Sequence, residues 1–335
     1  MSPTGRPEGE YRSAQHEGSP VSPTGRPEGE YRSAQHEGSP VSPTGRPEGE
    51  YRSAQHEGSP VSPTGRPEGE YRSAQREGSP ASGEVALKLT GITVRFGGVV
   101  ALHDVGFEVR AGETVGLIGP NGAGKTTLLN VISRFIPASG GRVELFGEDV
   151  SRVPAYGLPR RGVARTFQIV QPFANLTVRQ NVAVAAMFAG AGRSESEAAA
   201  QADAAIERTS LGAKADMLPA HITLADRKRL ELARALAMQP RVLLLDEVMA
   251  GLNHVEIDRI IALIRDIKAQ GTTVVVVEHV MKVIAAIADR IVVLKFGEKI
   301  ADDTPDRVFD DPAVVSAYLG DRFTRRRAAA RAGTP

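Results

Sequence analysis

Hydrophobic and polar residues alternate along the chain from residue 85 onward. Apolar side chains stand at every second position in three runs, which predict half-buried strands at 85–89, 92–96 and 105–109. Three further runs rich in Val, Leu and Ile predict buried strands at 114–118, 242–245 and 274–277. Isoleucines recur at helical spacing through 255–269, and Gly271 then marks the end of a helix. Strands that alternate with helices predict a mostly parallel α/β sheet.

The stretch from about 177 to 240 has a different character, because it is rich in alanine and has no strand pattern. It predicts a helical insert within the α/β region. We place this insert at about 169–240.

Residues 1–80 consist of four near-identical copies of a 20-residue unit, each a Met or Val followed by SPTGRPEGEYRSAQHEGSP, with Arg76 replacing His in the last copy. These 80 residues hold 12 apolar side chains and 12 of the 22 prolines of the chain. A stacked repeat fold needs a shared core, which the three apolar side chains of each unit, a Val or Met, a Tyr and an Ala, do not supply. Burial this small does not offset the entropy of ordering. We therefore expect a disordered tail at 1–82, a folded domain at 83–320 and a basic tail at 321–335.

Composition excludes several classes of protein. The 335 residues include no cysteine, which excludes disulfide scaffolds, cysteine-ligated zinc and thiol nucleophiles. No run of 18 apolar residues predicts a membrane span, and no apolar stretch near residue 1 predicts a secretory signal. Residues 1–80 hold 9 basic and 12 acidic residues, so the rest of the chain has a formal net charge of +4, which is too mild to indicate a nucleic-acid partner.

The sequence Gly119-Pro120-Asn121-Gly122-Ala123-Gly124-Lys125-Thr126-Thr127 joins the predicted strand 114–118 to helix-like residues at 128–132. This is the P-loop pattern, in the strand-to-helix context that its mechanism requires. Glycines let backbone N–H groups curl round an anion, Lys125 supplies charge to the β- and γ-phosphates, and the Thr126 hydroxyl can bind Mg²⁺. The pattern predicts that nucleotide is bound by Gly119, Asn121, Gly122, Gly124, Lys125, Thr126 and Thr127.

Residues with acid–base side chains follow the later predicted strands. Asp246 and Glu247 come directly after the run 242–245, and His279 follows the run 274–277. In a P-loop protein an aspartate at this place holds Mg²⁺, and a neighbouring carboxylate can act as general base on the attacking water. A histidine after a strand is commonly structural, but the ends of parallel strands meet at one edge where ligands bind. His279 is therefore a candidate for contact with the γ-phosphate.

The chain resembles an ATP-binding cassette (ABC) ATPase in the order of its motifs. Besides the motifs above, the resemblance rests on Gln168, in the sequence Arg165-Thr166-Phe167-Gln168, and on the segment 225–234. The sequences at 230–234, 245–252, 277–281 and 317–320 are similar to those of the ATP-binding subunits of bacterial branched-chain amino acid importers. The resemblance covers about 85–320. It implies a P-loop NTPase fold of ABC type, with a mostly parallel core sheet, an antiparallel β subdomain and a helical insert. It also implies an ATPase that uses ATP and Mg²⁺ to power transport.

The resemblance assigns roles to the residues that match family positions. Phe96 matches the aromatic that stacks on adenine, although an alternating strand also accounts for this residue. Gln168 matches the glutamine that reaches Mg²⁺ and the water, Asp246 and Glu247 match the metal-binding and catalytic acids, and His279 matches the switch histidine. The resemblance thus assigns catalysis to Glu247, His279 and Gln168, and metal binding to Thr126, Gln168 and Asp246.

In this family two cassettes face each other head to tail, and each ATP lies between the P-loop of one and the signature motif of the other. The usual signature is Leu-Ser-Gly-Gly-Gln, whereas residues 222–226 read Ile-Thr-Leu-Ala-Asp. Thr223 keeps a hydroxyl for the facing γ-phosphate, and the backbone N–H groups of Leu224 and Ala225 can donate, but the added Cβ atoms hinder close approach. Asn253 stands where the family usually has an aspartate. We expect a competent P-loop site and a weaker signature half.

The resemblance implies partners and a location. The partners are a second ABC ATPase subunit, identical or different, and transmembrane permease subunits, with an extracytoplasmic solute-binding protein acting indirectly. The location is peripheral, at the cytoplasmic face of the inner membrane, and the solutes are branched-chain or related amino acids. No nucleic-acid partner is expected, because the basic run 227–229 is interpreted as a solvated helix face. Deletion of residues 1–80 is expected to leave ATP binding intact.

Two other functions stay open on sequence alone. A DNA-repair or translation ATPase of the same superfamily is one, although such proteins typically carry coiled-coil arms or two cassettes, and this chain has no sustained heptads. A weakly catalytic regulatory subunit is the other, and the intact Lys125, Asp246, Glu247 and His279 argue against it. A guanine-specific GTPase is not expected, because the nearest match to Asn-Lys-x-Asp, at 213–216, begins with Ala.

Overall fold

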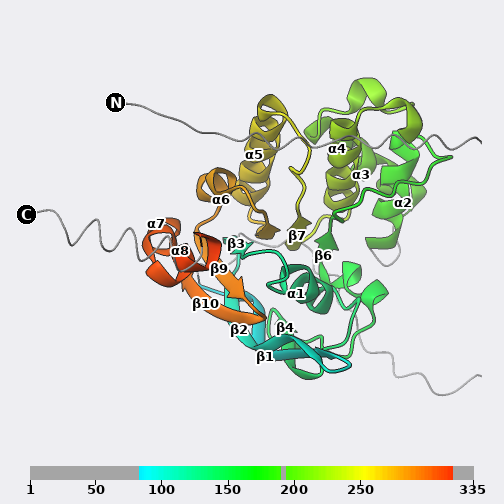
Figure 1. Cartoon of the computed structure of the whole chain (residues 1–335). Helices are drawn as coiled ribbons and strands as arrows, with labels where there is room; N and C mark the ends of the chain where they lie inside the picture. The colour runs from blue at the N-terminus through cyan, green and yellow to red at the C-terminus, as the bar shows by residue number, and fades with distance from the viewer. Residues whose placement is uncertain (1–82, 190–193, 320–335) are drawn as a thin grey trace, which may run out of the picture. The chain divides into compact units, whose positions relative to one another are not determined.

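A computed structural model describes residues 83–189 and 194–319. The predicted tails, 1–82 and 321–335, lie outside these described residues. The described part is built on two sheets with helices around them (Figure 1).

The central sheet has six strands in the order β10-β9-β3-β8-β7-β6. Neighbouring strands run parallel except β10, which is antiparallel to β9. This arrangement confirms the mostly parallel core sheet. The strands are β3 (Thr114–Ile118), β6 (Val163–Arg165), β7 (Val242–Asp246), β8 (Thr273–Val277), β9 (Arg290–Lys295) and β10 (Glu298–Asp303).

The second sheet is antiparallel, in the order β2-β1-β4-β5, which confirms the antiparallel β subdomain. Its strands are β1 (Val85–Phe96), β2 (Val99–Arg110), β4 (Gly140–Leu145) and β5 (Glu148–Asp149). The runs predicted as two strands, 85–89 and 92–96, form the single strand β1, whose pairing with β2 shifts register between Leu89 and Ile92. A bulge of this kind lets one strand continue through an interrupted alternation.

Helices α2 (Val178–Ala189), α3 (Glu195–Arg208) and α4 (Leu224–Ala237) lie between β6 and β7 in the chain and pack on one another, as the predicted helical insert requires. The other helices are α1 (Lys125–Ile132), α5 (His254–Ala269), α6 (Met281–Ile287), α7 (Pro305–Asp310) and α8 (Pro312–Leu319). Short 3-10 turns occur at Ala155–Gly157, Pro159–Arg161, Gly212–Lys214 and Pro219–His221.

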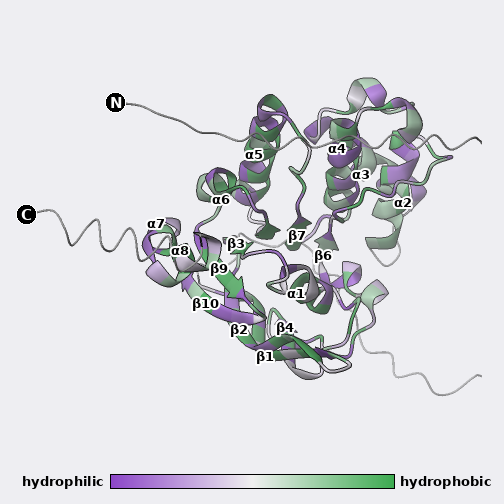
Figure 2. Ribbon diagram, in the orientation of Figure 1, coloured by the Kyte–Doolittle hydropathy of each residue, from purple (hydrophilic) through white to green (hydrophobic). Residues whose placement is uncertain are grey.

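The central sheet separates two hydrophobic cores, because successive side chains of a strand point to opposite faces. On β7, Leu243 and Leu245 pack with residues of the insert and α5, whereas Val242 and Leu244 pack with residues of α1 and the antiparallel sheet. Figure 1 shows α1 on one side of the central strands and α5 on the other. Figure 2 shows inner strands such as β9 as hydrophobic, whereas the edge strand β10 is mainly hydrophilic. Burial on both faces explains why β7 and β8 read as continuous apolar runs. Among the described residues, no helix combines the length and the apolar character that a membrane crossing needs.

Candidate functional site

The loop between β3 and α1 takes its shape from glycine. Gly119, Gly122 and Gly124 have positive φ angles of 153°, 78° and 100°, which side chains rarely adopt. A Cβ on Gly119 would lie 2.2 Å from the backbone oxygen of Leu294, and one on Gly124 would lie 2.7 Å from Cδ2 of Leu102. Glycine therefore lets the loop pack directly against β9 and β2.

The ammonium group of Lys125 lies against this loop. Its Nζ donates to the backbone oxygens of Gly119 at 2.7 Å and Pro120 at 3.1 Å. Burial lowers the pKa of the Lys125 ammonium, and the nearby charges of Glu247 and Asp246 oppose that shift. The first N–H groups of a helix have no intrahelical acceptor, so the start of α1 and this cation together suit a phosphate group.

A cavity of about 430 Å³ opens over the loop, a volume typical of small-molecule sites. Residues 121–127 line it together with Gln168 and Glu247, and its apolar wall is formed by Val99, Val100, Ala101 and Phe296. Three segments that the sequence singled out separately therefore meet at one cavity.

Asp246 ends β7 and is almost fully buried. Its Oδ2 accepts a hydrogen bond from Nη2 of Arg165 at 2.9 Å, whereas its Oδ1 is buried and has no hydrogen-bond partner within the described part of the chain. Burial raises the pKa of the Asp246 carboxyl, and Arg165 opposes that shift. An orphaned buried carboxylate oxygen is suited to a cation, and Asp246, Thr126 and Gln168 offer the oxygen ligands that Mg²⁺ prefers. The residues present therefore fit Mg²⁺.

Glu247 follows Asp246 with a positive φ of 48°. Its backbone N–H donates to the oxygen of Val277 on β8 at 3.0 Å. Its Oε2 accepts a hydrogen bond from the side-chain amide of Gln168 at 2.7 Å. The backbone anchor and the Gln168 amide together hold the Glu247 carboxylate at the cavity wall.

Lys228, on α4, is a buried cation that sequence analysis misplaced. Its Nζ donates to the backbone oxygens of Gln168 at 2.9 Å and Glu247 at 3.3 Å. The interpretation of 227–229 as a solvated helix face is wrong for this residue, which is only 4% exposed. Burial lowers the pKa of the Lys228 ammonium, and four carboxylates oppose that shift: Glu278, Glu247, Asp246 and Glu231.

His279 lies just beyond β8 and is exposed. Its Nδ1 is 4.0 Å from Oε2 of the buried Glu278, and His279 does not line the cavity. Oε1 of Glu278 accepts a hydrogen bond from the backbone N–H of Met249 at 3.0 Å, and burial raises the pKa of the Glu278 carboxyl. Glu278 therefore ties the segment before His279 to the loop that follows Glu247.

Two aromatic residues lie near the cavity, and only one of them lines it. Phe96 pairs across the β1–β2 hairpin with Val99, which lines the cavity, but Phe96 itself does not. Phe296, in the β9–β10 turn, lines the cavity and is 81% exposed. The stacking role of Phe96 stays a prediction, and Phe296 is a second candidate that sequence analysis missed.

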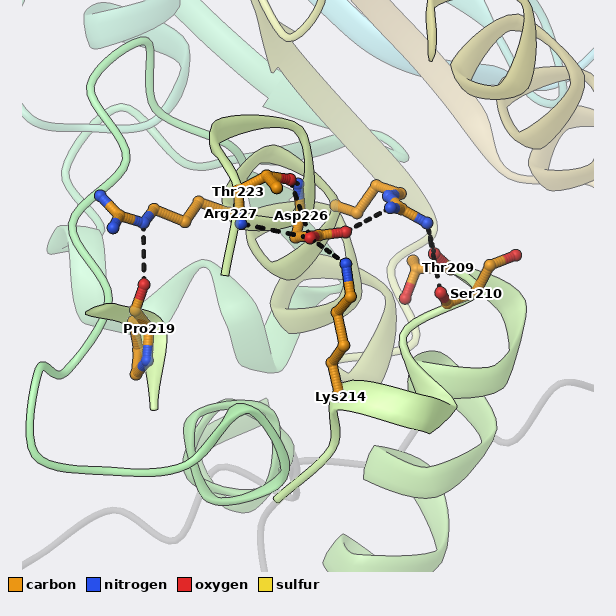
Figure 3. A network of polar contacts seen from close by, with 8 residues as sticks. Thr209, Ser210, Lys214, Pro219, Thr223, Asp226 and Arg227 are labelled. Atoms are coloured by element: carbon orange, nitrogen blue, oxygen red, sulfur yellow. Dashed lines mark hydrogen bonds and ion pairs between the residues drawn. The ribbon is translucent and has the colours of Figure 1, made fainter. Parts of the chain in front are cut away.

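The residues of the signature segment lie at the start of α4, away from the cavity lining. Thr223 caps the helix: its hydroxyl accepts from the N–H of Asp226 at 3.2 Å and donates to Oδ2 of Asp226 at 2.8 Å. The fully buried Asp226 also forms ion pairs with Lys214 and Arg229. Figure 3 shows Lys214 and Thr223 directed at Asp226. The Asp226 carboxylate therefore engages the Thr223 hydroxyl within the chain, while Ala225 is buried beside it.

Arg165, three residues before Gln168, is a second charged residue of the site that the sequence did not predict. Its guanidinium bonds Asp246 from β6, the strand that pairs with β7. Arg165 lies on β6, which pairs with β7, and Lys228 lies on α4, which contacts β6, so only the tertiary arrangement brings these two residues to the site. Their charge alone is typical of exposed residues.

The chain is similar to known proteins over most of the described residues. A model of the ABC transporter family matches residues 102–250, and a model of the branched-chain amino acid ATP-binding cassette transporter matches residues 298–324. The high-affinity branched-chain amino acid transport ATP-binding protein BraF of Pseudomonas aeruginosa is 39% identical over 249 residues, which cover 70% of this chain and 98% of that protein. The corresponding protein LivG of Escherichia coli is 37% identical with the same coverage.

Solved structures give the same result for the fold. A nucleotide-free ATP-binding cassette from an ABC transporter matches with a TM-score of 0.66 and 28% identity, over 71% of this chain and all of that one. A dimeric ATP-binding cassette bound to ADP and phosphate matches with a TM-score of 0.61 and 27% identity, over 65% of this chain and 98% of that one. Both contain the cassette that the described residues form.

Proposed function

The chain belongs to the ATP-binding subunits of ABC transporters, and from that premise we propose that it hydrolyses ATP for an importer of branched-chain or related amino acids. The observation that carries the proposal is the single cavity lined by the P-loop residues 121–127, Gln168 and Glu247. BraF and LivG, which match nearly end to end, are branched-chain amino acid transport proteins by name. Those relatives favour the importer over a DNA-repair or translation ATPase.

Binding of ATP begins with the P-loop. Lys125 and the N-terminal N–H groups of α1 bind the phosphates, and their combined positive charge stabilises the triphosphate in the cavity. The apolar wall, with Val99, Val100 and Phe296, suits the adenine ring. Asp246 and Thr126 would hold Mg²⁺, which neutralises phosphate charge when bound with ATP.

Hydrolysis needs a group that accepts a proton from water. Glu247 is placed for this task at the cavity wall, with Gln168 donating to one of its carboxylate oxygens. The hydrogen bonds from Lys228 to the backbone oxygens of Gln168 and Glu247 hold these two residues in position relative to each other. His279 lies outside the lining, and its contact with the γ-phosphate stays a prediction.

The proposed assembly follows the family pattern. A second ATP-binding subunit faces this chain head to tail, and permease subunits carry the solute, with a solute-binding protein on the far side of the membrane. The chain then works as a peripheral subunit at the cytoplasmic face of the inner membrane, where ATP is supplied. The C-terminal match to the branched-chain amino acid transporter model supports this assignment.

The proposal is tested with purified full-length chain and its Glu247→Gln variant. We expect kcat for ATP hydrolysis to fall by about 10² to 10⁴, because a general base is lost, while ATP-dependent dimers accumulate on size-exclusion chromatography. Glu195→Gln, at an exposed position on α3, is the matched control and should behave like wild type. Wild type without ATPase activity, or an active Glu247→Gln variant that forms no dimer, would contradict the proposed chemistry.

The solute class needs a separate experiment. The chain is reconstituted in liposomes with permease subunits and a solute-binding protein of an importer, and ATPase stimulation by leucine, isoleucine and valine is compared with stimulation by an amide and urea. Stimulation by the branched-chain amino acids supports the proposed solutes. Stimulation by urea or the amide alone would retain the ATPase and replace the solute.

A further inference from the structure

We propose that Arg165 is a positioning residue that fixes the Asp246 carboxylate, so that Oδ2 is held by the protein and Oδ1 is left to face Mg²⁺. The inference rests on the proposed function of this site, and it concerns a residue that neither the P-loop pattern nor the acidic pair identifies. It is carried by the contacts of one buried guanidinium with three segments.

The first contact joins β6 to β7. Arg165 is the last residue of β6 and pairs with Leu244 of β7, two positions before Asp246. Its Nη2 lies 2.9 Å from Oδ2 of Asp246, and the two side chains are only 6% and 2% exposed. Water therefore competes little for this ion pair, and the carboxylate keeps one orientation.

The second contact joins Arg165 to the P-loop helix. Its Nη1 donates to Oδ1 of Asn130 at 2.7 Å and to Oγ of Ser133 at 2.6 Å, both on or next to α1. Since α1 begins with Lys125, the guanidinium bridges the phosphate-binding helix and the carboxylate that would hold the metal. A planar guanidinium can span both sides in this way, whereas a lysine ammonium is a single point of charge.

The third contact covers the guanidinium with aromatic rings. The Cζ of Arg165 lies 5.8 Å from the ring centroid of Phe135 and 5.2 Å from that of Phe167. The two rings meet edge to face with 5.3 Å between their centroids. Cation–π contacts on these rings restrict the guanidinium further, so its two hydrogen-bonding edges stay directed at Asp246 and α1.

The consequence lies at Asp246 itself. Its backbone N–H donates to Oγ1 of Thr166, the residue after Arg165, at 3.3 Å. Main chain and Oδ2 are thus both anchored on the 165–166 segment, while Oδ1 is buried without a hydrogen-bond partner among the described residues. Loss of the Arg165 anchor would let the carboxylate rotate and would remove the cation that balances it.

The test compares Arg165→Gln and Arg165→Lys with wild type in three measurements on the full chain. ATP binding is measured in EDTA with a fluorescent ATP analogue, Mn²⁺ binding by electron paramagnetic resonance in the presence of ADP, and the Mg²⁺ concentration for half-maximal ATPase rate by titration. We expect unchanged affinity in EDTA, Mn²⁺ affinity weaker by about tenfold, and a matching rise in the Mg²⁺ requirement for Arg165→Gln. Arg165→Lys should bind Mn²⁺ more tightly than Arg165→Gln and more weakly than wild type. Arg142→Gln, which removes an exposed ion pair with Asp149, is the control.

Ser133→Ala serves as a second variant, because it removes one acceptor of Arg165 without touching Asp246. It should shift Mn²⁺ affinity in the same direction by a smaller factor, and it covers the case in which Arg165→Gln fails to fold. Unchanged or tighter Mn²⁺ binding in the folded variants would overturn the role of Arg165. A wild type that lacks Mg²⁺-dependent ATPase activity would instead overturn the proposed function, so the two failures are distinguishable.

Discussion

The side-chain amide of Gln168 donates a hydrogen bond to Oε2 of Glu247 at 2.7 Å, although 79 positions separate the two residues in the chain. Gln168 belongs to the segment that leads from β6 to the helical insert, whereas Glu247 follows β7 of the central sheet. One hydrogen bond therefore joins the start of the insert to the carboxylate that we propose as general base.

Removal of the Gln168 amide should lower the rate of ATP hydrolysis more than the affinity for ATP. We expect Gln168→Ala to reduce kcat by about tenfold or more, since a hydrogen bond to a charged group is worth about 1.5–3 kcal/mol, and to change KM for ATP little. Gln168→Glu should reduce kcat further, because its carboxylate would repel Glu247. Steady-state kinetics check the order, and equal rates for wild type and both variants would show that the bond has no catalytic role.

The apolar wall of the cavity predicts an adenine contact at Phe296. Base–aromatic stacking is worth about 1–3 kcal/mol, so Phe296→Ala should weaken binding of a fluorescent ATP analogue by about fivefold or more. Phe96→Ala, the variant suggested by family resemblance, is measured beside it, and Phe188→Ala on α2 is an exposed aromatic control. If Phe96→Ala alone weakens binding, the contribution assigned to Phe296 is wrong.

The buried ammonium of Lys228 predicts a loss of both activity and stability when it is removed. Lys228→Met keeps the apolar stem but leaves the backbone oxygens of Gln168 and Glu247 without this donor. We expect kcat to fall by about tenfold and the thermal unfolding midpoint to drop. Lys282→Met, at an exposed position, is the control and should change neither quantity. A stable and fully active Lys228→Met variant would contradict this prediction.

Asp226 predicts a pH dependence of stability. Burial raises the pKa of its carboxyl, but hydrogen bonds from Lys214 and Thr223 and the charge of Arg229 outweigh burial, so the net shift is downward. A lowered folded-state pKa stabilises the protein above the unfolded value of about 4, and this stability is lost as pH falls through the folded value.

The Asp226→Asn variant tests this pH dependence, because it removes the titrating carboxyl. It should reduce the free energy of unfolding at pH 7 by about 2 kcal/mol, less than for a fully buried pair because Lys214 is partly exposed. The difference from wild type should shrink below pH 4, as measured by denaturant unfolding across pH. Asp216→Asn, whose ion pair with Arg179 is exposed, is the control. A constant difference across pH would rule out the linkage.

The signature segment predicts a gain of activity from glycine. Leu224→Gly with Ala225→Gly should raise the ATPase rate of the dimer, because the backbone at the start of α4 could then approach the facing nucleotide. Glycine in a helix costs about 1 kcal/mol per residue, so Ala199→Gly with Ala200→Gly on α3 controls for that loss. Absence of any gain would contradict the idea of a weakened signature half.

Local patterns predicted the parts of the site that depend on neighbouring residues in the chain. The P-loop was recognisable because glycines, Lys125 and the flanking strand and helix are contiguous. Asp246 and Glu247 were recognisable because they end an apolar run. A local contact also explains why Asn253 can stand where the family usually has an aspartate. Its Oδ1 caps α5 by accepting a hydrogen bond from the N–H of Glu256 at 3.0 Å, and Asn and Asp cap helices equally well.

Features that depend on distant neighbours were not predictable from one sequence. Arg165 and Lys228 are charged, and only the strand order and the packing of α4 show that the Arg165 side chain is 6% exposed and Lys228 is buried. Strand β9 was missed although 291–294 is fully buried, because no motif drew attention to it. Phe296 follows from β9, since it occupies the turn between β9 and β10.

The left-handed backbone of Glu247 sets stability against chemistry at a single residue. A side chain in this conformation costs about 1–2 kcal/mol that glycine would avoid, and φ here is 48°. The fold therefore carries strain at the position where its proposed chemistry needs a carboxylate. Replacement of Glu247 by glycine would relieve this strain and remove the carboxylate, so stability and turnover make opposite demands on this one position.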